Sequence, residues 1–283
     1  MIAILLAGTS ALVWGTADFC GGKAVQQGAA SVRGHSFSVT VVSQLCAIPM
    51  IAVFLLLVPG RLGVSALGWG AASGVAGLFG IVLLYQGLAS GAMSVVAPIT
   101  AVTSALVPLA GGLALGERPG AVPLAAAACA VLAIALVSLG PSAGASAVTP
   151  RVIGLALSSG AFFGVFFLLL AQAGPSAGMW PLAGARLASI PIGLALLRPM
   201  GGTLVLRGRV LALTALAGCL DIAANGLYLL AANAGQLSIV APIASLYPAS
   251  TVLLALAVNG ERLRAIQVAG LGLSATALIL AAV

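Results

Sequence analysis

Two long stretches of the chain contain no charged residue, and each is long enough to cross a membrane twice. They run from Leu62 to Gly116 and from Ile222 to Gly260, whereas one membrane-spanning helix needs only about 20 apolar residues. Over the whole chain 5% of the residues are charged, but soluble domains carry about a quarter. Most of the chain must therefore face lipid. The sequence lacks the short alternating segments of an outer-membrane barrel, so we predict an all-α integral membrane protein.

The chain carries a formal net charge of +7, which in a soluble protein would suggest binding to nucleic acid. Here the basic residues fall singly between the apolar stretches and form no stripe. Basic residues in short loops beside a membrane set the orientation of the protein instead. No nucleic acid is therefore expected as a partner.

A Gly- and Ser-rich segment, residues 140–150, divides ten apolar spans into two groups of five. We therefore expect a single transmembrane domain over residues 1–283, with a first repeat at 1–140 and a second at 150–283. Links of three residues join the third span to the fourth and the eighth to the ninth, and such short links require antiparallel neighbours. The predicted spans are 2–21, 36–58, 69–90, 94–115, 121–139, 152–173, 179–197, 210–232, 236–258 and 265–283.

A repeated hexapeptide indicates that the two halves are related. Residues 94–99 read SVVAPI, and residues 238–243, which lie 144 positions further on, read SIVAPI. At the same offset the Gly-Glu-Arg sequence of residues 116–118 recurs at residues 260–262. Because each half has an odd number of spans, the second half is expected to enter the membrane in the opposite orientation. Two inverted halves around a central site are typical of secondary transporters.

The first span contains the pair Trp14-Gly15, and each half carries one Ala-Pro helix and one Gly-Glu-Arg turn. Together these features resemble the EamA-type family of the drug/metabolite transporter superfamily, over essentially the whole chain. The resemblance implies a ten-helix, multi-pass carrier of the inner cell membrane that moves small metabolites or drug-like solutes, often in exchange for protons. It also implies that spans three, four, eight and nine line the central cavity. The chain departs from the family at Gln44, because many members have an arginine in both corresponding places and only Arg186 is present here.

The positions at which the two halves differ are the better candidates for a substrate site. Asp221 lies in the middle of the eighth span, where the first half has Gly77. A charged residue at that depth costs at least about 2.5 kcal/mol and usually faces a cavity or a partner. Asn225 and Tyr228 follow about one and two turns later on the same helical face. We predict that this carboxylate, amide and phenol form a substrate site that responds to protons or cations.

Arg186 gives a second interpretation of Asp221. The two residues lie at similar depths in neighbouring spans, and the difference amounts to roughly 5 Å at 1.5 Å per helical residue. An arginine side chain can reach that far, so a structural ion pair is also expected. The two interpretations are compatible, and both are kept.

Further candidates come from the aromatic and acidic residues of the spans. Tyr247 replaces a threonine of the first half, and Trp14, Tyr85 and Gln86 could supply cavity surface, although aromatic residues between helices more often serve packing alone. Asp18 lies near the end of the first span, where it either couples transport to an ion or reaches interfacial water.

The prolines of the repeated helices predict local breaks. Proline has no N–H, so the carbonyl four residues earlier loses its partner. Helices are therefore expected to begin or bend at Pro98, Pro242 and Pro248. Glu117 and Glu261, which lie in the two Gly-Glu-Arg turns, are expected to stabilise these turns and anchor them at the interface.

We expect a secondary active transporter that works by alternating access, with export coupled to protons, and not an enzyme. An uncoupled channel or facilitator is the alternative. A membrane-embedded lipid-modifying enzyme would need clustered acids, histidines or metal ligands, and the chain has four acids and one histidine. The four cysteines show no metal or redox spacing, so no metal, cofactor or catalytic residue is expected. The expected partners are a small-molecule substrate, the lipid bilayer and protons, with the chain as a monomer or weak homodimer.

The distribution of basic residues and the family resemblance predict opposite orientations. Loops after odd-numbered spans hold eight of the Lys and Arg residues, whereas loops after even-numbered spans hold only Arg61 and Arg118. The positive-inside rule would therefore put both termini outside the cell. The resemblance implies cytoplasmic termini, and this is the orientation we expect.

Overall fold

The structure is a computed structural model that describes residues 1–27, 32–88, 93–138, 149–247, 249–250, 254 and 264–282. Within these ranges every regular element is a helix, as the sequence predicted. The elements are α1 (Ile2–Gln26), α2 (Val32–Cys46), α3 (Ile48–Leu57), α4 (Val64–Leu88), α5 (Met93–Ala114), α6 (Ala121–Ser138), α7 (Pro150–Ala171), the 3-10 turn η1 (Pro175–Ala177), α8 (Trp180–Leu197), α9 (Gly208–Ala234), α10 (Leu237–Ala244) and α12 (Ala265–Ala282).

Six helical segments of the described chain are long and apolar enough to cross a membrane. They correspond to the first, second, third, sixth, seventh and eighth predicted spans. The described parts of α5, α6 and α12 contain shorter apolar segments. The count of ten spans therefore stays a prediction, while the multi-pass helical architecture is present.

Two of the predicted spans are interrupted rather than straight. The second span consists of α2 and α3, which meet at Ala47 because Pro49 in the first turn of α3 has no N–H to donate to the preceding helix. In the ninth span α10 ends at Ala244, and Pro242 lies inside this short helix. Pro242 thus lies near the end of a helix and not at its start. Pro248 and the side chain of Pro98 lie outside the described residues, although α5 remains helical through position 98.

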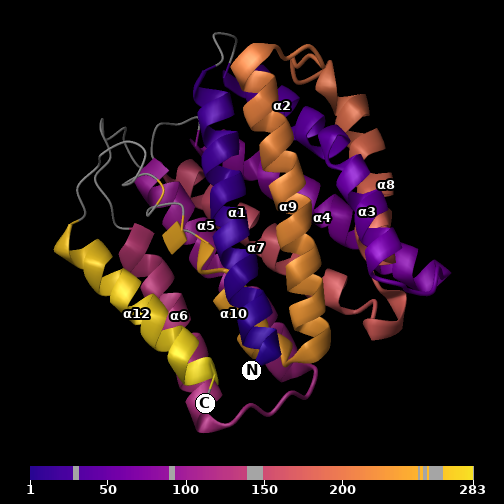
Figure 1. Cartoon of the computed structure of the whole chain (residues 1–283). Helices are drawn as coiled ribbons and strands as arrows, with labels where there is room; N and C mark the ends of the chain where they lie inside the picture. The colour runs from indigo at the N-terminus through magenta and orange to yellow at the C-terminus, as the bar shows by residue number, and fades with distance from the viewer. Residues whose placement is uncertain are drawn as a thin grey trace.

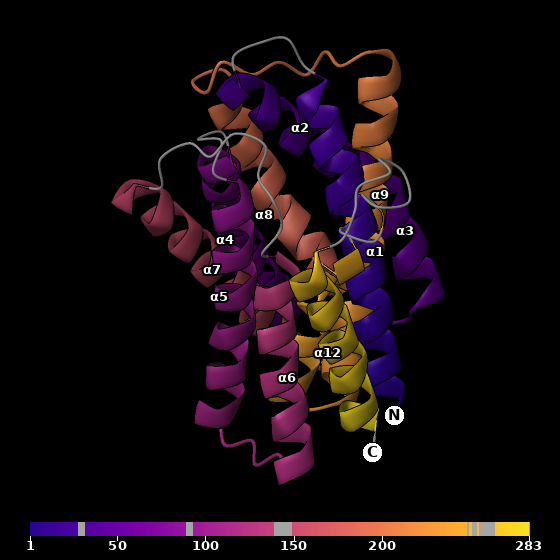
Figure 2. The same cartoon turned by 90° about the vertical axis from the view of Figure 1, so that its left-hand side faces the viewer.

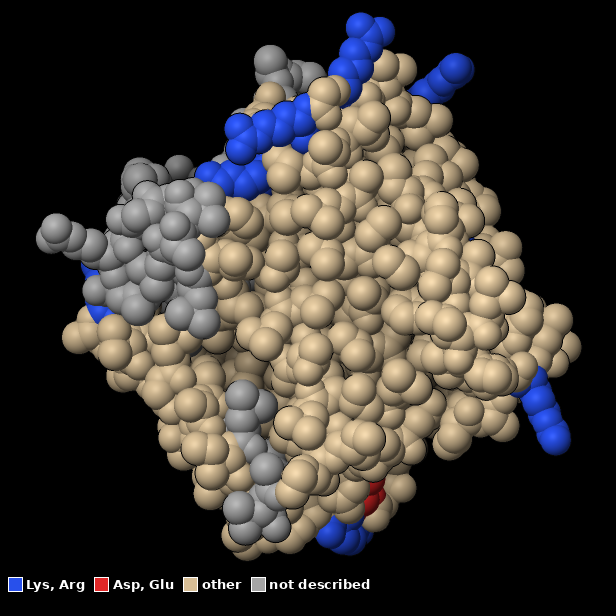
Figure 3. All heavy atoms as spheres, viewed as in Figure 1, with Lys and Arg blue, Asp and Glu red and all other residues tan. Residues whose placement is uncertain are grey.

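In the view of Figure 3 most charged side chains lie toward the top and the bottom, one basic side chain projects at the lower right and one lies at the left edge, and a broad uncharged surface lies between them. Lys23 lies in the last turn of α1, Arg198 follows α8, and Arg207 precedes α9. These helix ends lie together at the top of Figure 1, whereas both chain termini lie at the bottom. The uncharged surface between the two ends matches a bundle that spans a membrane.

The two halves pack against each other reciprocally. Helix α1 lies along α9, and its counterpart α7 lies along α4 (Figures 1 and 2). In the same way α5 packs on α7 and α10 packs on α1, while α6 and α12 form a separate pair beside them. The first helix of each half thus contacts helices of the other half.

Corresponding residues of the two halves form corresponding hydrogen bonds. Ser10 Oγ on α1 donates to the carbonyl oxygen of Ala224 on α9 at 2.8 Å, and Ser159 Oγ on α7 donates to that of Gly80 on α4 at 2.8 Å. Ser159 is offset from Ser10 by 149 residues, and Ala224 from Gly80 by 144. Both hydroxyls are fully buried. The repeat seen in the sequence is therefore also a repeat of interhelical contacts.

Glycine allows two equivalent helix crossings to come into backbone contact. A Cβ atom at Gly74 of α4 would overlap the carbonyl oxygen of Ala185 on α8, and one at Gly218 of α9 would overlap that of Ser43 on α2. The two crossings are related by the repeat. Small residues at such points let membrane helices approach closely, which is the main source of their association in lipid.

Candidate functional site

An ion pair inside the helical bundle joins the two charged residues that the sequence placed at similar depth. Arg186 Nη2 on α8 donates to Asp221 Oδ2 on α9. The Arg186 side chain is 13% exposed and the Asp221 side chain 40% exposed. The structural interpretation of these two residues is therefore confirmed. The exposure of the carboxylate leaves it accessible to a further group.

Trp14 binds the second oxygen of the Asp221 carboxylate. Its indole Nε1 on α1 donates to Asp221 Oδ1 at 3.2 Å. Asp221 thus joins three helices, because α1 and α8 each supply one donor to a carboxylate on α9. An acceptor with two occupied oxygens holds its neighbours in a defined geometry.

The other half of the protein has no counterpart of this ion pair. Arg186 corresponds to Gln44 and Asp221 to Gly77. Gln44 Oε1 accepts a hydrogen bond from Ser189 Oγ at 2.6 Å, so the related place on α2 carries a neutral contact. Since both charged partners are missing together from the first half, the scaffold does not require the pair. This asymmetry favours a specific role in the second half.

Asp18 lies one turn after Trp14 on α1 and close to Asp221. The residue is exposed at this position of α1. The carboxylates of Asp18 and Asp221 are close enough to interact electrostatically. Within the described part of the chain, no hydrogen bond or ion pair involves the Asp18 side chain.

The polar residues that follow Asp221 on α9 point into the protein. Asn225 is 3% exposed, and its Nδ2 donates to the carbonyl oxygen of Asp221 at 2.6 Å. Its Oδ1 is buried without a partner among the described residues. Tyr228 is fully buried and donates its hydroxyl to the carbonyl oxygen of Phe167 at 3.0 Å.

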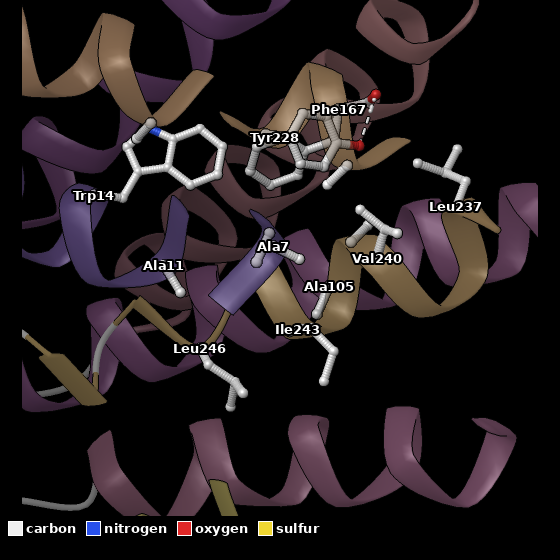
Figure 4. Packing of buried hydrophobic residues seen from close by; sticks show 14 of the residues in the cluster. Ala7, Ala11, Trp14, Ala105, Phe167, Tyr228, Leu237, Val240, Ile243 and Leu246 are labelled. Atoms are coloured by element: carbon white, nitrogen blue, oxygen red, sulfur yellow. Dashed lines mark hydrogen bonds between the residues drawn. The ribbon is translucent and has the colours of Figure 1, made fainter. Parts of the chain in front are cut away.

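The ring of Tyr228 supports the ring of Trp14. Figure 4 shows both rings beside Phe167, above the alanines of α1. The ring centroids of Trp14 lie 5.9 Å from Tyr228 and 5.2 Å from Phe167. Aromatic pairs in this range attract each other beyond simple burial. Tyr228 therefore holds Trp14 in position for its bond to Asp221.

Tyr247 approaches the same region from the segment that follows α10. Its phenol interacts with Ser104 on α5 and lies within electrostatic range of Asp18. Gln86 is half-buried on α4. The side chain of Tyr85 lies outside the described residues. The structure thus joins Asp221, Arg186 and Trp14 by direct contacts, and no described contact links Gln86 to them.

The first Gly-Glu-Arg turn ends α5 and also contacts α10 in the other half of the protein. Gly116 has a φ of 97°, a conformation that favours glycine, and it ends α5 with bonds from its own N–H to Leu113 O and from Glu117 N to Gly112 O. Glu117 is thereby aimed at α10. Its two carboxylate oxygens accept from the backbone N–H groups of Leu237 and Ser238, at 2.7 and 2.8 Å.

Glu117 therefore caps the helix that carries the second copy of the hexapeptide. The sequence predicted a role in the turn but missed this contact between halves. The sequence offered one signal for this contact, because each hexapeptide lies at the same distance from its Gly-Glu-Arg turn in both halves. Glu261 lies outside the described residues.

We expect Glu117→Ala to lower the free energy of unfolding by about 1–2 kcal/mol, because two N–H groups at the start of α10 lose their acceptor. Thermal unfolding of the purified protein in detergent would measure this. Arg118→Ala is the matched control, since Arg118 is exposed and bonds only to carbonyls of its own turn. Equal shifts for the two variants would contradict the capping role.

No group of three His, Cys, Asp or Glu residues that could hold a metal occurs in the described chain. Cys219 Sγ lies 3.7 Å from the carbonyl oxygen of Cys46, and all four cysteines are free thiols. The polar site is therefore built from carboxylates, a guanidinium and aromatic groups.

A model of the EamA-like transporter family matches the sequence twice, over residues 1–139 and 150–283. The chain belongs to the EamA-like transporter family. The two matches also show that the chain is built from two related repeats. Members of this family are membrane transporters, so the chain is a multi-pass membrane protein of the transporter class.

The fold of the chain resembles solved structures. One, described only as the crystal structure of a protein, superposes with a TM-score of 0.77 at 18% sequence identity, over 99% of this chain and 96% of that one. At this identity the likeness concerns the fold alone. A search among curated proteins finds no match.

Proposed function

We propose that this protein is a secondary active transporter of the inner cell membrane that exports a small metabolite or drug-like solute in exchange for protons. Alternating access around the region between α1, α8 and α9 would expose the site to one side and then the other. The observation that carries the proposal is the Arg186–Asp221 ion pair, whose carboxylate also accepts from Trp14, with Asp18 one turn after Trp14 on α1. Intramembrane ionisable groups typically mark ion or substrate paths.

We further propose that the two repeats have inverted topology and comprise ten spans. The reciprocal contacts of α1 with α9 and of α7 with α4 support an arrangement in which each half can rock against the other. The site would consist of Asp221, Arg186, Trp14 and Tyr247. Asn225 and Tyr228 would support it from the next two turns of α9. Tyr85 and Gln86 are proposed as cavity surface on α4, and Pro242 as the point at which α10 ends and bends.

The function is tested by flux measurements in proteoliposomes that contain the purified full chain and a pH-sensitive dye. Amino acids, nucleosides and cationic drugs are added in turn from outside. We expect one class to drive proton movement in the opposite direction and to accumulate against its own gradient when a pH gradient is imposed. Flux that only ever follows the solute gradient, at any pH gradient, would indicate a channel or facilitator instead. Turnover of the lipids in the same vesicles would indicate an enzyme.

A further inference from the structure

A charged contact joins the two halves at one end of the bundle. Glu117 lies in the turn between α5 and α6 of the first half, whereas Leu237 and Ser238 begin α10 of the second half. The Glu117 carboxylate accepts from the backbone N–H groups of both residues, at 2.7 and 2.8 Å. The turn lies at the bottom of Figure 1, with both chain termini. We call Glu117 with these two N–H groups the inter-half clamp.

Close backbone approach brings the parts of the inter-half clamp together. A Cβ atom at Gly112, near the end of α5, would overlap the Glu117 carboxylate and would lie 2.9 Å from the Ser238 nitrogen. A Cβ atom at Gly235, in the link between α9 and α10, would lie 2.8 Å from the Cβ of Ala3 on α1. Two elements of the first half, α1 and the end of α5, therefore contact the same short segment of the second half.

The rest of α10 lies against apolar side chains of the first half. Figure 4 shows Val240 and Ile243 of α10 near Ala7 of α1 and Ala105 of α5, and all four residues are buried. Apolar contact of this kind is not directional. The inter-half clamp adds two directional hydrogen bonds to a charged acceptor, which are roughly twice as strong as neutral ones.

Two buried hydroxyl groups oppose the packed position of α10. Ser238 lies in its first turn and Ser245 directly after its end, and both residues are 0% exposed. The Oγ atom of each has no hydrogen-bond partner among the described residues. A buried hydroxyl without a partner costs free energy that contact with water would recover. Glu117 thus favours the packed position of α10, whereas the two serines favour a position in which water reaches this segment.

We propose that the inter-half clamp is a gate latch, which opens when the transporter exposes its site to the side of the membrane on which the chain termini lie. This inference rests on the proposed function, because in alternating access the halves separate on one side at a time. The structure is then the state that is closed on that side. Opening breaks the two hydrogen bonds of Glu117 and hydrates the hydroxyls of Ser238 and Ser245, so both contributions set the balance between closed and open states.

The test measures how fast N-ethylmaleimide alkylates a buried reporter, Ser245→Cys, in the full chain in lipid nanodiscs. Ser245 lies about 10 Å beyond Ser238 along α10 at 1.5 Å per residue, so fraying of the first turn alone leaves it buried. Its hydroxyl has no partner among the described residues, so the substitution removes none of the described hydrogen bonds. Peptide mass spectrometry gives the rate at this cysteine separately from the four native free thiols.

Three further substitutions, each added to the reporter, give different expected rates. Glu117→Gln keeps the size of the side chain but replaces one acceptor oxygen by a donor amide, and it should raise the alkylation rate about tenfold through the loss of one charged hydrogen bond. Ser238→Ala removes an unsatisfied hydroxyl and should lower the rate severalfold. Arg118→Ala is the matched control, since Arg118 is exposed and bonds to carbonyls of its own turn, and it should leave the rate unchanged.

The native thiol of Cys20, which is 7% exposed on α1, reports unfolding of the whole chain. Equal acceleration at Cys20 and at the reporter in Glu117→Gln would show that Glu117 only stabilises the fold, and would overturn the latch. An unchanged reporter rate in Glu117→Gln would also overturn it. Ser238→Ala loses no described hydrogen bond and tests the latch without Glu117→Gln, because a faster rate in this variant contradicts the proposed balance.

The outcomes separate this inference from the proposed function. Coupled flux in proteoliposomes, with a reporter rate that does not respond to Glu117→Gln, would overturn the latch and leave the transporter intact. The expected changes in alkylation, without coupled flux of any solute class, would leave the opening of the inter-half clamp intact and overturn the proposed exchange mechanism.

Discussion

Asp221→Asn is expected to reduce proton-coupled transport to the level of empty vesicles while the protein still folds and inserts. Asparagine keeps the volume and can still accept the Trp14 N–H through its amide oxygen, but it cannot neutralise Arg186. The variant therefore leaves the guanidinium without its carboxylate and removes the acidic group that the proposed exchange requires.

Solute and proton flux in proteoliposomes, measured for the variant and the unmodified chain at equal protein content, checks this expectation. Removing one partner of a poorly solvated ion pair also destabilises a protein, whereas removing both is often tolerated. The double variant Asp221→Asn with Arg186→Gln is therefore the control. It should regain stability but not coupling. Normal pH-dependent flux in Asp221→Asn would refute the role of this carboxylate.

Gly74→Ala and Gly218→Ala are expected to cause large losses of stability for such small substitutions. The added methyl group would overlap the carbonyl oxygen of Ala185 or of Ser43, on the neighbouring helix. Because the obstacle is backbone, the helices must move apart, at a cost of about 1–3 kcal/mol. The repeat relates the two crossings, so the two losses should be similar in size.

Unfolding in a graded series of denaturing detergent would measure both variants. Gly68→Ala on α4 is the matched control, since a Cβ at Gly68 meets nothing within 4 Å. Alanine has a higher helix propensity than glycine, so this control should be neutral or slightly stabilising. A stability for Gly74→Ala equal to that of Gly68→Ala would show that the α4–α8 contact is looser than the structure indicates.

The ion pair was within reach of sequence reasoning because helix geometry converts residue number into depth. Arg186 and Asp221 could be placed at similar levels from the ends of their spans, and the structure brings them together. Depth alone does not give rotation about the helix axis. The sequence placed Tyr228 on one helical face with Asp221, but it could not predict that the Tyr228 hydroxyl bonds to the backbone of α7.

Other contacts could not be predicted from the sequence, because they depend on which helices become neighbours. Asp18 was assigned to the end of the first span, and nothing in the local sequence distinguished an interfacial acid from one that faces Asp221. Glu117 was assigned to its own turn, but its carboxylate caps a helix 120 residues further along the chain. The hexapeptide suggested a bend, and the structure shows one short helix with Pro242 near its end.

The sequence by itself determined that this protein is helical, lies in the membrane and consists of two related halves. These conclusions follow from the absence of charge over long stretches and from the repeat, which are properties of the chain order alone. Only the tertiary structure decided which charges meet, because α1, α8 and α9 become neighbours through contacts such as the hydrogen bond of Ser10 on α1 to Ala224 on α9. The membrane sets the depth of each residue, but packing between helices sets the direction in which it faces.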